Sequence, residues 1–138
     1  MNDSLKLMFI DGEWVAAEGG KKFDVLNPAT GEAFAEVADG GREETKRAID
    51  AAERAMKSWS KVSPKDRGAI LRKAQTNILE RKDEIARYIT SENGKPLEEA
   101  KREVEFASGY FSWFAEEARR AYGKTIPSPY PHKQDLCS

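Results

Sequence analysis

Short apolar segments separated by turn residues fill the first part of the chain, up to about residue 41. The apolar run Leu7–Ile10 is followed by the pair Asp11-Gly12 and then by Glu13–Val15. An Asp-Gly pair between two such runs is a strong signal for a two-residue hairpin turn. Residues 23–25 and 34–37 also have strand-like composition, on either side of a turn that contains proline and glycine. This part of the chain is therefore predicted to form short β-strands or hairpins.

Apolar positions then repeat at helical spacing from about residue 42 to residue 122. Ser63-Pro64 is typical of a helix start, because serine can cap the helix, proline suits its first position and Asp66 can complete the cap. Gly94 is a natural helix end and Pro96 a natural restart. We expect three helices before residue 94. Their apolar faces carry Ala48, Ile49, Ala52, Ala55, Met56 and Trp59, then Ile70, Leu71, Ala74, Ile78 and Leu79 as a buried face, then Ile85, Tyr88 and Ile89.

The fourth predicted helix, from about residue 97 to Tyr122, carries two apolar faces. At 1.5 Å per residue its length would be roughly 39 Å. A second face holds Phe106, Tyr110 and Trp113. The earlier helices can cover one face, and nothing obvious in the chain covers the other. The first face is a seam of positions three and four residues apart, namely Leu97, Ala100, Val104, Ala107, Phe111, Phe114 and Ala118.

Charge and composition exclude several kinds of function. The 138 residues include 23 Lys and Arg and 24 Asp and Glu, a formal charge of -1. This balance argues against a nucleic-acid binder, which would need a basic face, and against a protein bound to anionic membranes. A single cysteine, Cys137, allows no disulfide framework within a monomer. No apolar run approaches the ~18 residues of a membrane span, and the first residues do not resemble a targeting signal, so we expect a cytoplasmic protein.

Six motifs follow one another along the chain: Phe9–Trp14, Asn27–Glu32, Trp59, the Arg67, Ile70 and Leu71 set, Glu92–Pro96 and Gly123–Pro127. In this order they resemble the aldehyde dehydrogenase family. The helix segment Tyr110–Ala118 is most similar to the succinate-semialdehyde dehydrogenase branch. The resemblance implies that residues 1–133 are the N-terminal part of the family's cofactor-binding domain and that residues 134–138 are a divergent tail.

The family's fold is α/β, and the resemblance implies that this chain holds a partial N-terminal piece of it. That piece would consist of short strands or hairpins followed by about four helices, which would cover one side of a parallel sheet that the chain does not encode. Residues 124–138, with Pro127, Pro129 and Pro131, are expected to form an extended connector. The resemblance stops near Lys133. A fragment, a prematurely terminated reading frame and a frameshifted copy are three explanations that the sequence leaves open.

The resemblance also implies a reaction. In the family a cysteine thiolate attacks an aldehyde, hydride passes to NAD or NADP, and water activated by a glutamate hydrolyses the thioester. The 138 residues contain neither the family's glycine-rich cofactor turn nor its catalytic cysteine and glutamate. We therefore expect no catalytic residue, no binding of NAD or NADP and no activity in this chain alone. The choice between NAD and NADP in the parent enzyme, and the exact aldehyde, stay open.

Two aromatic residues are the candidate site residues. Phe106 and Tyr110 match positions that, in the family, face the tunnel through which the aldehyde reaches the active site, although they could also be ordinary core aromatics. Cys137 and His132 are not expected to act as nucleophile or metal ligand, because no partner group stands near them in the sequence.

Several polar and glycine positions are interpreted as structural. Gly19-Gly20 and Gly40-Gly41 lack the G-x-G-x-x-G spacing of a cofactor turn and are interpreted as ordinary turns. Asn27, Gly94 and Lys95 are interpreted as turn and cap residues.

An interaction module is the alternative function. An uncovered aromatic helix face could bind a second copy of the chain or a full-length subunit, because exposed apolar patches often mark partner surfaces. A free-standing helical ligand binder is a third hypothesis, and nothing in the sequence points to a ligand.

Overall fold

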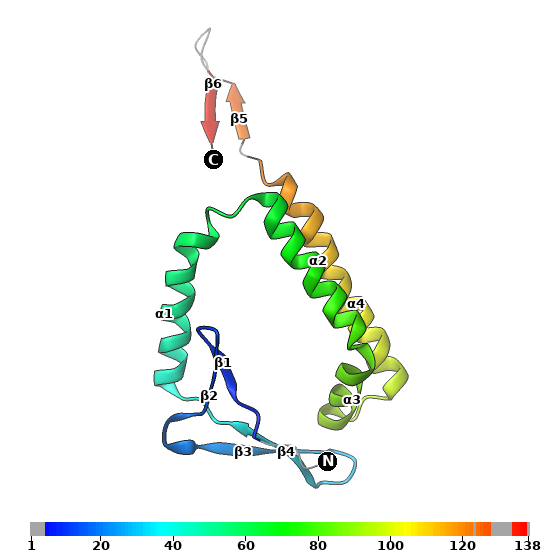
Figure 1. Cartoon of the computed structure of the whole chain (residues 1–138). Coiled ribbons are helices and arrows are strands. Elements are labelled where there is room, and N and C mark those ends of the chain that lie inside the picture. The colour runs from blue at the N-terminus through cyan, green and yellow to red at the C-terminus, as the bar shows by residue number, and fades with distance from the viewer. Residues whose placement is uncertain (1–4, 123, 128–133, 138) are drawn as a thin grey trace.

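The computed structural model describes residues 5–122, 124–127 and 134–137, which form short hairpins and helices (Figure 1). The predicted fold class, short strands followed by four α-helices, is confirmed in this part of the chain. The strands pair antiparallel into separate two-stranded hairpins, β1–β2, β3–β4 and β5–β6. The elements are β1 (Met8–Ile10), β2 (Glu13–Val15), the 3-10 helix η1 (Glu18–Gly20), β3 (Lys22–Leu26), β4 (Ala33–Ala38), α1 (Arg42–Trp59), α2 (Pro64–Glu80), α3 (Lys82–Asn93), α4 (Leu97–Glu117), the 3-10 helix η2 (Ala118–Arg120), β5 (Lys124–Pro127) and β6 (Gln134–Cys137).

The predicted Asp-Gly hairpin turn is confirmed. Asp11 and Gly12 have φ values of 56° and 85°, and a type I′ turn needs positive φ at both central residues. Phe9 pairs with Trp14 across the strands, and their ring centroids are 5.1 Å apart. An ion pair of 2.8 Å between Asp11 and Arg54 ties this hairpin to α1. The turn chemistry of two residues therefore fixes where the chain reverses.

Local capping signals also place the helix ends. Ser63 Oγ accepts a hydrogen bond from the Asp66 backbone N–H at 3.1 Å, and Pro64 occupies the first position of α2. Gly94 closes α3 in the left-handed conformation, with φ of 78°. The fourth helix is α-helical only to Glu117 and tightens into η2, so it ends slightly before the predicted Tyr122.

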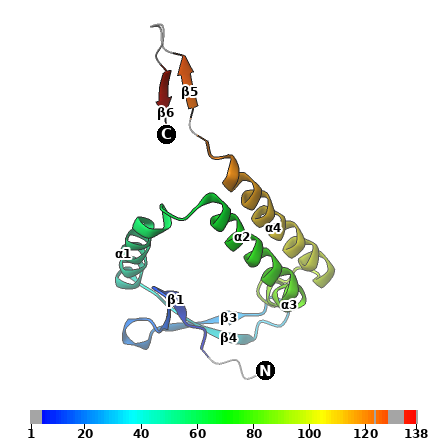
Figure 2. The same ribbon diagram turned by 45° about the horizontal axis from the view of Figure 1, so that its top comes forward.

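Helices α2, α3 and α4 form the main packed unit, in which α2 and α4 lie side by side (Figures 1 and 2). Ala86 of α3 and Ala100 and Val104 of α4 are buried together, next to partly buried isoleucines of α2 and α3. At Gly68 of α2 there is no room for a side chain against α4, because an added Cβ would lie 2.8 Å from the carbonyl oxygen of Ala115. Small residues therefore set the distance between these helices.

The seam predicted for α4 is covered in part: Ala100 and Val104 are buried and Phe111 and Ala118 are half-buried, but Leu97, Ala107 and Phe114 are exposed. The buried positions of α4 are Ala100, Val104, Ser108 and Ala115, whereas Phe114 of the predicted seam is 56% exposed. Small side chains at intervals of about one turn let α2 and α3 approach closely. The bulky aromatic residues are displaced to the sides of this line.

Other apolar faces predicted for the helices are also exposed. Ile49 on the stripe of α1 is 62% exposed, and Met56 beside it is exposed as well. Ile70 and Leu79, predicted to be buried on α2, are exposed too. Both views show α1 standing apart from the α2–α4 pair (Figures 1 and 2). The described strands form separate hairpins rather than a continuous sheet, so these faces have no sheet to pack against.

The sequence predicts an extended connector after α4, and this prediction is wrong. Lys124–Pro127 is extended, but it pairs antiparallel with Gln134–Cys137, so the chain folds back on itself. Pro129 and Pro131 lie outside the described residues. Pro127 pairs only at the end of its strand, where a missing N–H is tolerated. No helix in the described ranges combines the length and apolar character needed to cross a bilayer.

Candidate functional site

Phe106 and Tyr110 lie next to each other on an open face of α4. Their rings meet edge to face, with centroids 5.4 Å apart and planes at 88°. Phe106 is 71% exposed and Trp113, one turn further along, is 66% exposed. Within the described chain these side chains are exposed, and the alternative that they are core aromatics of a complete enzyme stays open. Their role as tunnel residues stays a prediction.

A shallow groove of about 470 Å³ follows this side of α4. Gly109 lies on its floor, and an added Cβ there would meet nothing within 4 Å. Glu105 stands at the rim and pairs with Lys82 of α3 at 2.7 Å, and this hydrogen bond raises the pKa of Lys82. Because the rim charges cancel each other, the groove presents an apolar surface. We call the face formed by Phe106, Tyr110, Trp113 and Phe114 the aromatic face.

The expectation that this chain holds no catalytic residue stays a prediction. Cys137 belongs to β6, and His132 lies outside the described residues. Among the described residues no group of three His, Cys, Asp or Glu side chains could hold a metal ion.

The turns at the paired glycines do not fit a dinucleotide phosphate. Gly19 and Gly20 belong to η1 with φ of 68° each, an ordinary turn. Gly41 precedes α1, but its N–H donates to Glu44 Oε2 at 2.8 Å. Glu44 Oε1 also accepts the Glu18 N–H at 2.6 Å, and this carboxylate is only 5% exposed. The protein's own carboxylate thus occupies the place that an anion would take at this helix start.

Hydrogen bonds from the backbone N–H groups of Glu44 itself, Glu18 and Gly41 hold the pKa of the Glu44 carboxyl below its usual value. The side chain thereby stays charged and fastens η1 to the start of α1. Sequence reasoning missed this buried acid, although a glutamate three residues after a glycine cap is a recognisable capping signal.

The structural interpretation of Asn27 and Gly94 is confirmed. Asn27 Oδ1 accepts the Ala29 N–H at 2.9 Å and shapes the turn between β3 and β4. Gly94 is the left-handed end of α3, and the ring of Pro28 lies 3.2 Å from where its Cβ would be. Lys95 lies in the short turn between α3 and α4, and its side chain pairs with Glu103 of α4.

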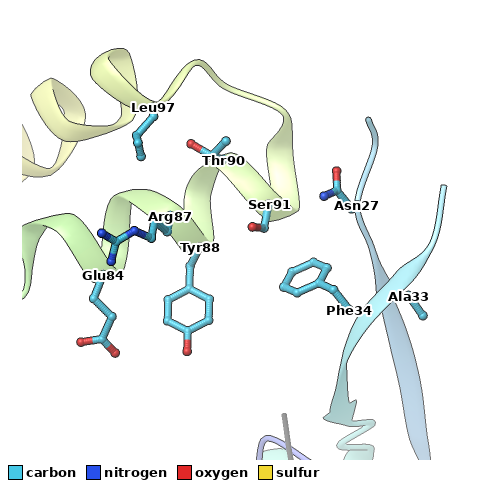
Figure 3. A pocket seen from close by; sticks show the side chains of 9 residues that line it. All are labelled: Asn27, Ala33, Phe34, Glu84, Arg87, Tyr88, Thr90, Ser91 and Leu97. Carbon is cyan, nitrogen blue, oxygen red and sulfur yellow. The ribbon is translucent and has the colours of Figure 1, made fainter. Parts of the chain in front are cut away.

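A second cleft, of about 740 Å³, was not predicted from the sequence. It lies between the β3–β4 hairpin and α3, and Phe34 and Tyr88 line it from opposite elements (Figure 3). The sequence pattern predicts only that Tyr88 lies on the apolar face of a helix. The cleft depends on how the hairpin meets α3, which no local pattern reveals.

The described chain consists of short antiparallel hairpins and a packed unit of helices. Residues 14–137 match the sequence profile of the aldehyde dehydrogenase family. The chain belongs to the aldehyde dehydrogenase family and corresponds to its amino-terminal part. The resemblance found in the sequence is therefore confirmed.

Two curated relatives illustrate the similarity. The chain is 46% identical over 126 residues to glutarate-semialdehyde dehydrogenase of Pseudomonas putida, a match that covers 91% of this chain and 26% of that protein. It is 45% identical over 125 residues to the NADP(+) succinate-semialdehyde dehydrogenase GabD of Escherichia coli, with the same coverage. The chain thus spans about a quarter of the length of the relatives it matches.

Solved structures place the fold in the same family. Succinate-semialdehyde dehydrogenase from Burkholderia pseudomallei superposes with a TM-score of 0.90 at 42% identity, over 94% of this chain and 27% of that one. A Y450L variant of betaine aldehyde dehydrogenase from Staphylococcus aureus, solved in complex with NAD+, also gives 0.90 at 34% identity, over 95% of this chain and 27% of that one.

Proposed function

We propose that this chain provides the scaffold and one wall of the aldehyde path in an NAD(P)-dependent aldehyde dehydrogenase that acts on a short aldehyde with an acidic end, with succinate semialdehyde as the leading substrate. The observation that carries the proposal is the open aromatic face of α4 in a chain of this family. Matched relatives include dehydrogenases named for glutarate semialdehyde, succinate semialdehyde and 3-sulfolactaldehyde. Each of these aldehydes is short and carries an acid group.

The aromatic face suits one wall of a substrate path because it exposes large rings without a partner in the described chain. Phe106 and Tyr110 support each other by their edge-to-face contact, which limits the movement of both rings. Gly109 leaves space between them and Trp113. A second wall from elsewhere in a complete enzyme would turn this open groove into a passage.

The isolated 138-residue chain should be inactive. The described residues assemble no nucleophile and base, and the start of α1 is filled by Glu44 rather than free for a phosphate. The test is the absorbance of reduced nicotinamide when purified chain, succinate semialdehyde and NAD+ or NADP+ are mixed. We expect no signal above a blank, and sustained production of NADH or NADPH would overturn this part of the proposal.

The wall itself can be tested in a chimera. Residues 7–127 would replace the corresponding segment of the Escherichia coli succinate-semialdehyde dehydrogenase, which is 45% identical. In an active chimera, Phe106→Leu with Tyr110→Leu should raise KM for succinate semialdehyde several-fold and leave the melting temperature nearly unchanged. Trp14→Leu, an exposed aromatic residue on the first hairpin, is the matched control. Equal KM values for all three proteins would refute the role of the aromatic face.

The aromatic face also favours a second candidate function, self-association or association with full-length subunits. Four exposed aromatic side chains on one side of a helix form a surface of the kind that partners bury. Light scattering of the isolated chain tests this. We expect a dimer or larger species that Trp113→Glu converts to a monomer, while Ile49→Glu on α1 does not. A monomer at all concentrations would exclude this candidate.

A further inference from the structure

The cleft between the β3–β4 hairpin and α3 has the size of a small-molecule site. Its volume of about 740 Å³ falls within the range of roughly 300–1,000 Å³ that is usual for such sites. Contact between Pro28 and the backbone at Gly94 holds the hairpin against the end of α3. The two walls of the cleft are therefore fixed relative to each other by packing that does not involve its interior.

Two aromatic rings face the interior from opposite walls. Phe34 points from β4 toward Tyr88 of α3, with open space between them (Figure 3). Ring contacts among the described residues are Phe9–Trp14 and Phe106–Tyr110, so Phe34 and Tyr88 do not stack on each other. A planar ring inserted between them could contact both, and aromatic pairs favour such contacts.

Polar groups without partners surround these rings. Arg87 and Ser91 are four residues apart on α3, which places them on one face of the helix, and neither side chain makes a hydrogen bond or ion pair within the described residues. Asn27 uses its Oδ1 in the turn, which leaves its Nδ2 as a donor toward the cleft. Thr90 Oγ1 is buried there without a partner, a state that is rare in folded proteins.

The residues that line the cleft carry one negative charge, on Glu84, and one positive charge, on Arg87. Glu84 also lines it, but Arg81 holds that carboxylate with two hydrogen bonds of 2.9 and 2.8 Å. Those bonds lower the pKa of Glu84 and keep the pair ionised. Because Glu84 is paired with Arg81, Arg87 is left as a lining cation without an ion-pair partner among the described residues. A guanidinium binds a carboxylate in a planar, two-pronged geometry.

From this geometry we infer that the cleft binds a small aromatic carboxylate, with its ring between Phe34 and Tyr88 and its carboxylate on Arg87, supported by Ser91 and Asn27. Two rings alone would accept any planar apolar molecule. The unpaired guanidinium of Arg87 and the neighbouring donors favour a molecule that carries a single negative charge. This inference concerns a different face of the molecule from the aromatic face of α4 and does not depend on the proposed dehydrogenase role.

Benzoate is the probe for the test, added to the isotope-labelled 138-residue chain while backbone amide NMR signals are followed. We expect saturable shifts confined to residues around 27, 34 and 87–91, with a dissociation constant on the order of a millimolar for so small a ligand. Benzamide, which has the same shape without the charge, should bind at least about tenfold more weakly, as expected for loss of a charge-assisted hydrogen bond. Cyclohexanecarboxylate, which lacks the planar ring, should also bind more weakly.

Matched variants separate this site from general anion binding. Arg87→Gln should weaken benzoate binding by about tenfold or more, whereas Arg102→Gln, which removes an exposed arginine on α4, should not. Phe34→Leu should weaken binding, whereas Phe23→Leu on the neighbouring strand β3 should not. Shifts scattered over the surface, equal binding of benzamide, or equal effects of the two arginine variants would overturn the inference. Amide spectra of each variant without ligand confirm that its fold is retained.

Discussion

Replacement of Gly68 by alanine tests a close contact between α2 and α4. An added Cβ would lie 2.8 Å from the carbonyl oxygen of Ala115, whereas carbon-to-oxygen contacts normally stay at about 3.3–3.6 Å. The shortfall is roughly half an ångström, and the obstacle is backbone in a buried part of α4 rather than a movable side chain. Relief of the clash would require α2 to move away from α4.

The magnitude follows from two opposing effects. Overpacking of a well-fitted contact costs about 1–3 kcal/mol, and alanine is favoured over glycine in a helix by about 1 kcal/mol. Gly109 of α4 offers the matched control, because an added Cβ there meets nothing within 4 Å. Gly109→Ala should therefore be more stable than the parent chain by up to about 1 kcal/mol. Gly68→Ala should be less stable than Gly109→Ala by about 1–3 kcal/mol, the cost of the contact itself.

Urea denaturation followed by helical circular dichroism measures both variants against the parent chain. The same slope with denaturant for all three proteins would indicate that the midpoints report stability rather than altered compactness. A Gly68→Ala variant as stable as Gly109→Ala would refute the reasoning, because it would mean that α2 and α4 are not in close contact at this point in solution.

Three further outcomes follow from capping, burial and charge. Ser63→Ala should lower stability by about 1 kcal/mol in the same denaturation assay, since the Asp66 N–H loses its acceptor, and an unchanged midpoint would contradict that role. Val104→Ala should cost about 2 kcal/mol, because this side chain is nearly fully buried, whereas Ile49→Ala on the exposed stripe of α1 should change little. Glu44 has a folded-state pKa below its unfolded value, so its contribution is present above the unfolded pKa and is lost as pH falls through the folded pKa. Glu44→Gln should thus flatten the loss of stability on acidification, and equal acid profiles for parent and variant would contradict this.

Features that depend on a few adjacent residues could be predicted from the sequence. The turn at Asp11 and Gly12, the start of α2 at Ser63 and the end of α3 at Gly94 all follow from backbone sterics and local hydrogen bonds. Such features depend little on what the rest of the chain does. The family could also be recognised from the sequence, because its six motifs are short segments that depend on such local constraints.

Features that depend on which elements meet could not be predicted. Periodicity shows that α4 has apolar residues on two faces, but it does not say which face α2 and α3 cover. The line of Ala100, Val104, Ser108 and Ala115 is covered, and one of its members is polar. Ser108 is accommodated because its hydroxyl donates to the Glu105 carbonyl oxygen at 2.7 Å. The cleft beside α3 escaped prediction for the same reason, because it exists only where the hairpin meets that helix.

The division of α4 into a covered and an open face bears on how function can be separated from stability. Small buried residues such as Ala115 hold the helix in place, while Phe106 and Tyr110 contribute little buried surface within the described chain. Substitutions on the open face should therefore leave the fold largely intact, and substitutions on the covered face should not. A loss of aldehyde affinity in Phe106 or Tyr110 variants of the chimera, without a loss of thermal stability, would then report on the substrate path itself. An equal loss of both would mean that the rest of the enzyme packs on this face, and the aromatic residues would be core residues of the complete enzyme.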